Sequence, residues 1–450
     1  MENQLQNNNK PISSFFQSTT AKMMMVGILT LVLLIPLTLV QDLIAERSQR
    51  KNEATEKVTN SWGDNINLMG PILKVPYTLY TQTEEIDEQT KEKKIKKYSY
   101  TQNAYFFPFD LNHSTKVDKV DKIKLGLYKP VVFKANVAVN GNFKNLDFEK
   151  LGIKPENMQW DKATLQIRTT NLKSIKSDLF VKINNEKYTL ETSGETNHGF
   201  DVLETKNFSI DSTSNFAFNF DIQYNGSNSV EFIPIGKTTK TSIDANWNSP
   251  SFIGNFAPID TTKNITNKSF HADWKLIHVN RPFAQQYSEK IPNLKEYAYG
   301  AKLIETVDHY QQNERASKYG FLVIGLTFLI FFLIQTISKI NIHIFQYTMI
   351  GLALIMFYTL LISITEHSSF TMAYAIAATS VIVMLLLYSI SVLKNKKFPL
   401  FITASLTLLY SFIFVIIQLE DYALLVGSIG LFLILGVVMY VSRKIDWNNN

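Results

Sequence analysis

Long apolar segments alternate with charged ones along this chain, and the apolar segments predict its architecture. Five of them follow one another in the last third of the chain, at residues 319–337, 345–364, 370–392, 398–418 and 422–441. Each is close to the ~20 apolar residues with which a helix crosses the ~30 Å hydrocarbon core of a bilayer. A sixth apolar segment, residues 23–43, follows a polar stretch of residues 1–22. The pattern therefore predicts six transmembrane helices.

The first apolar segment is predicted to be an uncleaved signal-anchor. A secretory signal has a shorter apolar region, which ends at a cleavage site of the small-x-small type. Here Leu43 occupies the position that needs a small residue if cleavage followed Ala45. Pro36 lies inside the segment and is compatible with a membrane helix, because neighbouring helices accommodate a kink.

The charges of the short connections predict the orientation. Basic residues occur on one side of the predicted spans and acidic residues on the other; the basic set is Lys10, Lys22, Lys339, Lys394, Lys396, Lys397, Arg443 and Lys444, and the acidic set is Glu366, Glu420 and Asp421. Lys and Arg are enriched in cytoplasmic loops. Residues 1–22 and 442–450 are therefore predicted to be cytoplasmic tails, and residues 44–318 a periplasmic domain.

The segment between the first two spans is predicted to be rich in β-strands. The first helix is expected to continue to about residue 61, and helix is expected again near residues 306–318. Between them, residues 122–274 alternate between polar and apolar positions, and residues 122–128 are a clear example. We expect a sandwich-like domain with helical edges.

Turn signals divide this region further. Asn140-Gly141 and Asn225-Gly226 each follow an alternating segment and are typical of hairpin turns, and Asn184-Asn185 separates two more predicted strands. Gly70-Pro71 and Pro76 are expected to interrupt the chain, and the charge-dense residues 84–97 are expected to form a solvated hairpin or loop.

Composition excludes several classes of function. The net charge of +6 is spread over 450 residues and does not indicate a nucleic-acid partner. The chain has no cysteine, so disulfides, thiolate catalysis and cysteine-bound metals are excluded. The predicted spans contain no Asp, Glu, Lys, Arg or His apart from Asp42 at the edge of the first, which argues against an ion-coupled transporter.

Candidate chemistry outside the membrane is sparse. Residues 235–238 read Ile-Gly-Lys-Thr, but Glu231 stands where a phosphate-binding loop needs its first glycine. The seven histidines are scattered, and the two pairs His271/Asp273 and Asp308/His309 would bind a metal only with distant help. We therefore predict no catalytic residue, cofactor or metal, and a protein that is not an enzyme.

Several motifs resemble the CreD family of bacterial inner-membrane proteins. They are Asn313-Glu314-Arg315-Ala316-Ser317-Lys318-Tyr319, Gln346-Tyr347-x-x-x-Gly351-Leu352, Met356-Phe357-Tyr358, Glu366-His367-x-x-Phe370, Gly70-Pro71 with Pro76, Trp247 with Pro250-Ser251-Phe252-x-Gly254, Trp274, and Arg443-Lys444-Ile445-Asp446-Trp447. The resemblance implies a role in cell-envelope integrity and stress response, with expression linked to the CreB/CreC two-component system. It implies no reaction, and the roles of the motif residues stay open.

Three hypotheses follow for the function. The first is an envelope protein whose periplasmic domain binds or scaffolds envelope components or other inner-membrane proteins, with the lipid bilayer as its other partner. The alternative is a transporter or channel for an uncharged or amphipathic envelope metabolite. A third is an envelope hydrolase that acts through His271, Asp273, Asp308 or His309.

Overall fold

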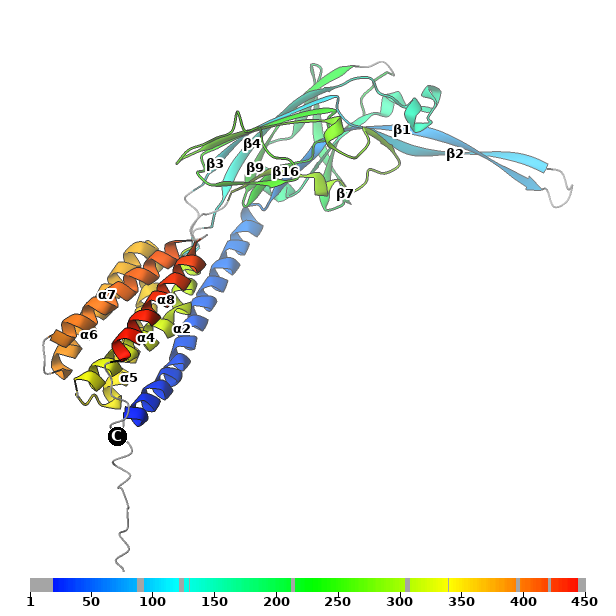
Figure 1. Ribbon diagram of the computed structural model, residues 1–450. Coiled ribbons are helices and arrows are strands. Elements are labelled where there is room, and N and C mark those ends of the chain that lie inside the picture. Colours follow the sequence, from blue (N-terminus) through cyan, green and yellow to red (C-terminus); the bar gives the residue numbers. More distant parts are fainter. Residues whose placement is uncertain are drawn as a thin grey trace, which may run out of the picture. The chain divides into compact units, whose positions relative to one another are not determined.

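A computed structural model describes residues 19–86, 93–120, 125–128, 130–211, 215–303, 308–338, 340–393, 397–419 and 422–443. The chain divides into two compact units (Figure 1). Residues 1–52 and 307–450 form one, called the helical unit, and residues 53–306 form the other, called the β unit.

The helices have the length and composition expected of membrane spans. They are α2 (Thr19–Trp62), α3 (His309–Lys318), α4 (Gly320–Ile337), α5 (Ile344–Thr365), α6 (Phe370–Val392), α7 (Lys397–Gln418) and α8 (Ala423–Ser442). With α3 and α4 taken together, the described residues contain six helical stretches that are long and apolar enough to cross a membrane. The predicted six-helix architecture is confirmed, and α2 continues well past the predicted span to Trp62.

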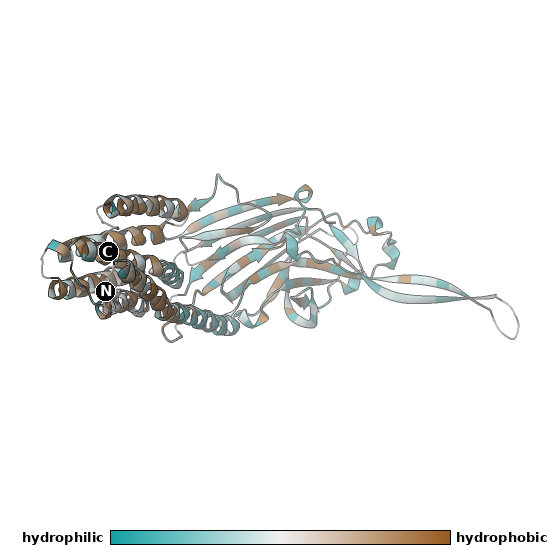
Figure 2. Cartoon of the chain, turned by 60° about the horizontal axis from the view of Figure 1, so that its bottom comes forward, coloured by the Kyte–Doolittle hydropathy of each residue, from teal (hydrophilic) through white to brown (hydrophobic). Residues whose placement is uncertain are grey.

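Aromatic and aliphatic side chains fill the interior of the helical unit, and Figure 2 shows how strongly hydrophobic residues dominate these helices. Two tyrosine hydroxyls inside it form hydrogen bonds with a neighbouring helix. The Tyr347 hydroxyl lies 2.9 Å from Oε1 of Gln335, and the Tyr374 hydroxyl donates to the Tyr410 carbonyl at 2.8 Å. Such bonds are expected where lipid offers polar groups no other partner.

The β unit is one curled sheet of 16 strands in the described residues. The strands are β1 (Ile66–Ile86), β2 (Lys93–Phe106), β3 (Asp110–Lys119), β4 (Phe133–Phe143), β5 (Thr164–Thr169), β6 (Phe180–Ile183), β7 (Glu186–Asn197), β8 (Phe200–Thr205), β9 (Phe216–Gly226), β10 (Ser229–Phe232), β11 (Thr238–Ala245), β12 (Pro250–Gly254), β13 (Asn264–Ile265), β14 (Phe270–Ile277), β15 (Gln286–Ser288) and β16 (Tyr299–Leu303). The spatial order is β12-β16-β10-β1-β5-β8-β7-β6-β9-β4-β3-β11-β14-β13, and β2 pairs with β1 and β15.

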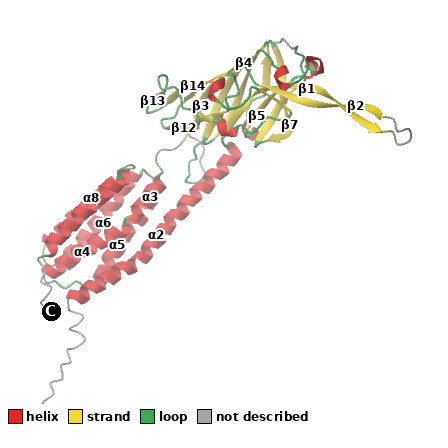
Figure 3. Cartoon of the chain, turned by 45° about the vertical axis from the view of Figure 1, so that its right-hand side comes forward, coloured by secondary structure: helices red, strands yellow, loops and turns green. Residues whose placement is uncertain are grey.

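The two halves of the sheet, joined through β6 and β7, face each other across an apolar core (Figure 3). Along β4 and β9 buried and exposed residues alternate, as expected for strands with one face in a core. Rings from opposite halves meet: His113 stacks on Phe232 at 4.5 Å, and Trp274 lies 5.8 Å from Tyr299. The predicted sandwich-like domain is therefore confirmed.

Two of the predicted hairpin turns are wrong. Asn140-Gly141 lies inside β4, where both residues pair with β3 on one side and β9 on the other. A Cβ atom on Gly141 would lie 2.0 Å from the Asp110 carbonyl oxygen, so this glycine permits close strand approach rather than a turn. Asn225-Gly226 ends β9, but the next strand, β10, pairs with β1 and β16. The Asn184-Asn185 turn between β6 and β7 is confirmed.

The chain near residue 70 is also more regular than predicted. Gly70-Pro71, a cis peptide, and Pro76 both lie within β1 rather than interrupting it. The ladder with β5 shifts register between Met69 and Ile72, so a bulge accommodates the proline that cannot donate a hydrogen bond. β1 and β2 form a long hairpin that extends away from the other strands (Figures 1 and 3). Residues 84–86 and 93–97 belong to this hairpin, and residues 87–92 lie outside the described part.

The predicted strand at residues 122–128 is wrong where it is described. Residues 125–128 form a tight turn in which Leu125 and Tyr128 bond to each other, and Gly126 has a φ of +63°. Leu125 and Leu127 are exposed, so the apolar alternation there has no core to face. Residues 121–124 lie outside the described residues.

Candidate functional site

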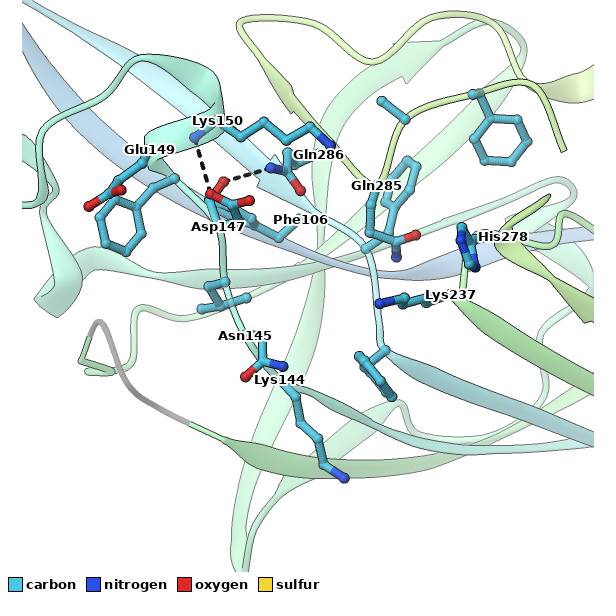
Figure 4. Close-up of a pocket in the computed structure, with 16 residues that line it drawn as sticks. Phe106, Lys144, Asn145, Asp147, Glu149, Lys150, Lys237, His278, Gln285 and Gln286 are labelled. Atoms are coloured by element: carbon cyan, nitrogen blue, oxygen red, sulfur yellow. Dashed lines mark hydrogen bonds between the residues drawn. The ribbon is translucent and has the colours of Figure 1, made fainter.

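The β unit contains an open cleft of about 740 Å³ with a mixed polar and aromatic lining (Figure 4). Its walls come from chain segments that are distant in sequence: the connection from β2 to β3, residues 144–150 after β4, Lys237 before β11, and residues 278–286. The volume lies within the ~300–1,000 Å³ typical of pockets that bind small ligands. The cleft is therefore the candidate binding site of this unit.

Arg281 holds one wall of the cleft in place. It is 6% exposed, and its guanidinium donates to the carbonyls of Phe283 at 3.0 Å, Ile235 at 3.0 Å and Gly236 at 3.2 Å. The same group bonds to the Gln285 side chain, whose amide nitrogen reaches Ile235 and a further carbonyl, that of Pro108. A single buried cation thus ties together the segments that carry the lining residues.

The Gln286 side-chain amide joins the opposite wall to this one. Nε2 of Gln286 donates to the carbonyl of Asp147 at 2.6 Å, and the Asp147 carboxylate accepts from the backbone N–H of Lys150 at 3.1 Å. Figure 4 shows Asp147, Glu149 and Lys150 grouped at one end of the cleft, apart from Lys237 and His278. The two ends of the cleft therefore differ in charge.

Positive charge gathers around the Phe109 ring. Nζ of Lys237 lies 5.0 Å from the ring centroid, and Nζ of Lys144 lies 5.8 Å from it. These are distances at which an aromatic face attracts a cation. Burial lowers the pKa of Arg281 to about 10, so this group also keeps its charge at neutral pH.

The predicted pair His271/Asp273 acquires a third member in the folded chain. Nδ1 of His271 lies 2.7 Å from the Asp244 carboxylate, and Nε2 lies 3.0 Å from the Asp273 carboxylate. The hydrogen bond to Asp244 is the largest cause that raises the pKa of His271. Within the described residues, no group of three or more His, Asp or Glu side chains could hold a metal ion.

The predicted pair Asp308/His309 has a structural role. The Asp308 side chain accepts from the backbone N–H of Tyr310 at 2.9 Å and so caps the start of α3. It also pairs with Lys51 of α2 at 3.1 Å. His309 lies 3.3 Å from the side chain of Gln312. The two residues therefore stabilise the N-terminus of α3 and do not form a shared site.

The family motif residues of the β unit lie outside the cleft. Phe252 of β12 contacts the Trp274 ring at 5.7 Å, and the Trp274 indole donates to the Phe256 carbonyl at 3.0 Å. Pro250 and Gly254 mark the ends of β12, and Gly254 has a φ of +89° beside β16. The remaining motif residues are Trp247, which is buried, and Gly70 and Pro71 in β1. The aromatic residues of this set pack in or against the core of the β unit, whereas Gly70 and Pro71 lie in β1, between β10 and β5.

Several family motif residues of the helical unit lie in the short helix α3 or at a helix end. Glu314 pairs with Lys318 at 2.8 Å along α3, Arg315 is exposed between them, and Tyr319 separates α3 from α4. Glu366 ends α5 and pairs with Arg47 of α2 at 3.7 Å. His367 is exposed beside it. Asp446 and Trp447 lie outside the described residues.

The sequence did not indicate the residues of the cleft. Lys144 belongs to no motif, and the pairing of β4 with β3 places it near Phe109. Lys237 lies in the Ile-Gly-Lys-Thr segment that looked like an incomplete phosphate loop. In the folded chain the carbonyls of Ile235 and Gly236 in that segment face Arg281, whereas a phosphate loop would present N–H groups.

The six membrane-capable helices, with a large β-rich unit between the first and second, define a polytopic membrane protein with a substantial domain outside the bilayer. The sequence pattern of the family "Inner membrane protein CreD" matches residues 18–448. The chain belongs to this family and is a multi-pass protein of the inner membrane.

One relative is the "Inner membrane protein CreD" of Escherichia coli (strain K12). It is 28% identical over 429 residues, which cover 93% of this chain and 91% of the relative. Among solved structures, a provisionally assigned nutrient binding protein from Legionella pneumophila subsp. pneumophila str. Philadelphia 1 aligns with 49% of this chain and 73% of its own at 9% identity. Its TM-score of 0.24 carries no argument about fold or function.

Proposed function

We propose that this protein supports the integrity of the cell envelope, under stress in particular, by binding an envelope component in the cleft of its β unit. The observation that carries the proposal is the cleft itself, open, about 740 Å³ in volume and lined by rings, amides and charged groups. A bound ligand would connect the envelope to the membrane in which the helical unit is embedded.

The periplasmic location of the β unit is part of this proposal. It is supported by the basic residues of the short connections, which fall on one side of the spans by the positive-inside rule. Reporter fusions after Glu366 and Asp421 are expected to report a periplasmic position, and a fusion after Lys397 a cytoplasmic one. A cytoplasmic signal from the β unit would overturn the orientation.

The proposal is non-enzymatic. In a hydrolase with a serine nucleophile, one ring nitrogen of the histidine must be available to accept the hydroxyl proton. Both ring nitrogens of His271 are engaged by carboxylates, Asp244 on one side and Asp273 on the other. If the alanine variants of His271 and Asp273 fail to complement a deletion strain while they fold normally, the hydrolase hypothesis gains over this proposal.

Complementation of a deletion strain tests the proposed function. Ala284 is exposed and lines the cleft, so Ala284→Trp places an indole inside it. Ala217 is exposed on β9 away from the cleft, which makes Ala217→Trp a matched control. We expect Ala284→Trp to leave cells sensitive to detergent and to drugs that target the cell wall, and Ala217→Trp to restore resistance. Full resistance with Ala284→Trp would refute the proposal.

A second candidate function is transport of an uncharged or amphipathic envelope metabolite. An apolar groove of about 750 Å³ in the helical unit favours it, with walls from α4, α7 and α8. Substrate-dependent flux in proteoliposomes that contain the full chain would support this function. Unchanged flux with Gly430→Leu, which fills the groove beside Phe412, would refute a path through it.

A further inference from the structure

The apolar groove of the helical unit has a lining that suits hydrocarbon. Its walls come from α4, α7 and α8, and its volume of about 750 Å³ lies in the range of pockets that bind small ligands. Almost every lining side chain is aliphatic or aromatic, and the lining side chains with polar atoms are Ser338, Lys397 and Ser405. Water is a poor occupant of such a groove, because it would find few hydrogen-bond partners there. An acyl chain finds apolar contacts along its whole length.

The groove extends over about one leaflet of a bilayer. Its lining residues lie within residues 326–338 of α4, 397–412 of α7 and 430–441 of α8. At ~1.5 Å per helical residue these stretches are about 16 to 23 Å long. One leaflet contains ~15 Å of hydrocarbon, or ~20 Å with its headgroups. In the described residues the lining stops more than one helical turn short of the opposite end of each helix, so the groove has the depth of a single lipid chain.

The inner end of the groove is closed where α7 and α8 approach each other. A Cβ atom on Gly430 would lie 2.0 Å from Cζ of Phe412, so the Phe412 ring rests directly on the backbone of α8. Further along, a Cβ atom on Gly427 would lie 3.8 Å from Cδ1 of Ile416, so the two helices remain close. A chain that enters from the other end would therefore stop at Phe412.

The last helix, α8, has few packing contacts of its own. None of its described residues is buried, whereas each of the other membrane-capable stretches buries part of its most apolar window. Helices in a bilayer are held together largely by van der Waals packing and by hydrogen bonds between helices. A hydrocarbon chain in the groove would contact α8 on one side and α4 and α7 on the other. It would therefore increase the packing of α8 against the other helices.

The outer end of the groove, opposite Phe412, is polar. Ser338 follows α4 and Lys397 begins α7, and both line the groove. Lys397 is exposed, and Arg443 lies two residues beyond Val441, the last lining residue of α8. Basic residues at this end of the spans are expected from the orientation alone. A lysine that also lines an apolar groove is placed to contact the acidic headgroup of a lipid bound there.

From these observations we infer that the groove holds an acyl chain of an anionic phospholipid, with the headgroup phosphate beside Lys397. The chain lies between α4 and α8, in the leaflet on the Lys397 side of the membrane, and ends at the Phe412 ring. The site is separate from the cleft of the β unit, so the inference goes beyond the proposed function and does not depend on it. It does not depend on the transport hypothesis either, because a lipid held in the groove need not cross the membrane.

Titration of the full chain in detergent with two lipids tests the inference, and native mass spectrometry measures the bound lipid. The lipids are phosphatidylglycerol, which is anionic, and phosphatidylcholine with the same acyl chains, which is zwitterionic. We expect phosphatidylglycerol to bind about fivefold more tightly, as one lysine beside the headgroup predicts. In Lys397→Gln this preference is expected to vanish, with binding of phosphatidylcholine unchanged.

Lys22→Gln is the matched control for charge. Lys22 precedes the first span and Lys397 follows the fourth, so both lie on the same side of the membrane. Lys22 donates to the Asn341 side chain at 2.9 Å and does not line the groove. This variant is expected to keep the fivefold preference. Equal binding of the two lipids by the wild-type protein, or a preference that survives Lys397→Gln, would overturn the inference.

Ser405→Phe tests whether the groove holds the acyl chain. Ser405 is half-buried and lines the groove, so a phenylalanine there fills it, whereas the neighbouring Ala404 is exposed and does not line it. We expect Ser405→Phe to bind both lipids at least tenfold more weakly and Ala404→Phe to bind them as the wild type does. Far-UV circular dichroism checks that both variants fold; if Ser405→Phe does not, Lys397→Gln decides alone.

Two outcomes of the Ser405→Phe experiment would contradict the inference. Unchanged binding of both lipids would place the acyl chain elsewhere on the protein. A change in oligomeric state with unchanged lipid binding would show that a second copy of the chain covers the groove.

Discussion

Gly254 at the end of β12 is a position where a single added methyl group has a calculable effect. Its φ is +89°, and a Cβ atom there would lie 2.1 Å from the Ala298 carbonyl oxygen and 2.7 Å from the Tyr299 Cα. Gly254 pairs with Tyr299 in the ladder between β12 and β16. Both obstacles are backbone atoms, so Gly254→Ala can be accommodated only if the two strands separate.

The expected cost has two parts. A non-glycine residue with positive φ costs about 1–2 kcal/mol, and overpacking against a fixed neighbour costs about 1–3 kcal/mol. Their sum is about 3 kcal/mol, which for a unit the size of residues 53–306 corresponds to a fall in Tm of ~6–12 °C. Gly152 has a φ of +71° and no atom within 4 Å of its added Cβ, so Gly152→Ala carries only the first part, about 1 kcal/mol.

Thermal unfolding of the full chain in detergent provides the measurement. Near-UV circular dichroism follows the β unit, because Phe252 on the same strand contacts the Trp274 ring at 5.7 Å. We expect Gly254→Ala to lower Tm several degrees further than Gly152→Ala does, and to weaken the aromatic signal already below the transition. If the two variants lower Tm equally, the close approach of β12 and β16 does not constrain this position and the reasoning is refuted.

Three further predictions concern titration and ion pairing. Burial lowers the pKa of His113 to about 3, so below pH 6.5 the unfolded chain binds a proton there that the folded chain does not. The β unit should therefore lose up to about 1.4 kcal/mol of stability per pH unit as the pH falls from 6.5. His113→Gln should make the fall of Tm between pH 7 and 5 less steep. The pKa of His271 is raised, chiefly by a hydrogen bond to the Asp244 carboxylate on β11. Its contribution to the stability of the β unit is therefore complete below pH 6.5 and is lost as the pH rises through the raised pKa. The Tm difference between wild type and His271→Gln should accordingly be larger at pH 6 than at pH 9. Arg47→Ala should destabilise the helical unit by about 1 kcal/mol because Glu366 is largely buried, whereas Arg50→Ala, which removes an exposed pair, should change the Tm in detergent little.

The helical unit could be predicted from the sequence because each span is defined by its own composition. A run such as Phe370–Val392 is apolar over the thickness of a bilayer whatever its neighbours are. The hydrogen bonds of a helix close within the segment, so no distant pairing is needed. The pairing of Gln335 with Tyr347 depends on how the helices pack against each other, which the composition of a single span does not determine.

The β unit was predictable in class and not in topology. Alternation along β9 correctly indicated a strand with one buried face. The Asn140-Gly141 turn was wrong because the sequence signal is the same for two uses of glycine. One use is a turn that needs a positive φ, and the other is a strand position at which the neighbouring backbone approaches too closely for a side chain. Which use applies depends on Asp110, about thirty residues away, as the 2.0 Å approach to its carbonyl shows.

The cleft lay beyond sequence reasoning for a related reason. Lys144 and Lys237 are separate in the chain, and each by itself looks like an ordinary surface cation. Both line the cleft because β4 and β11 pair with β3, which brings the ends of both strands beside Phe109. The sequence by itself determined where the chain enters the membrane, since burial in lipid depends on local hydrophobicity. Only the tertiary structure decided which charges share a cleft, since that depends on strand pairing between distant segments.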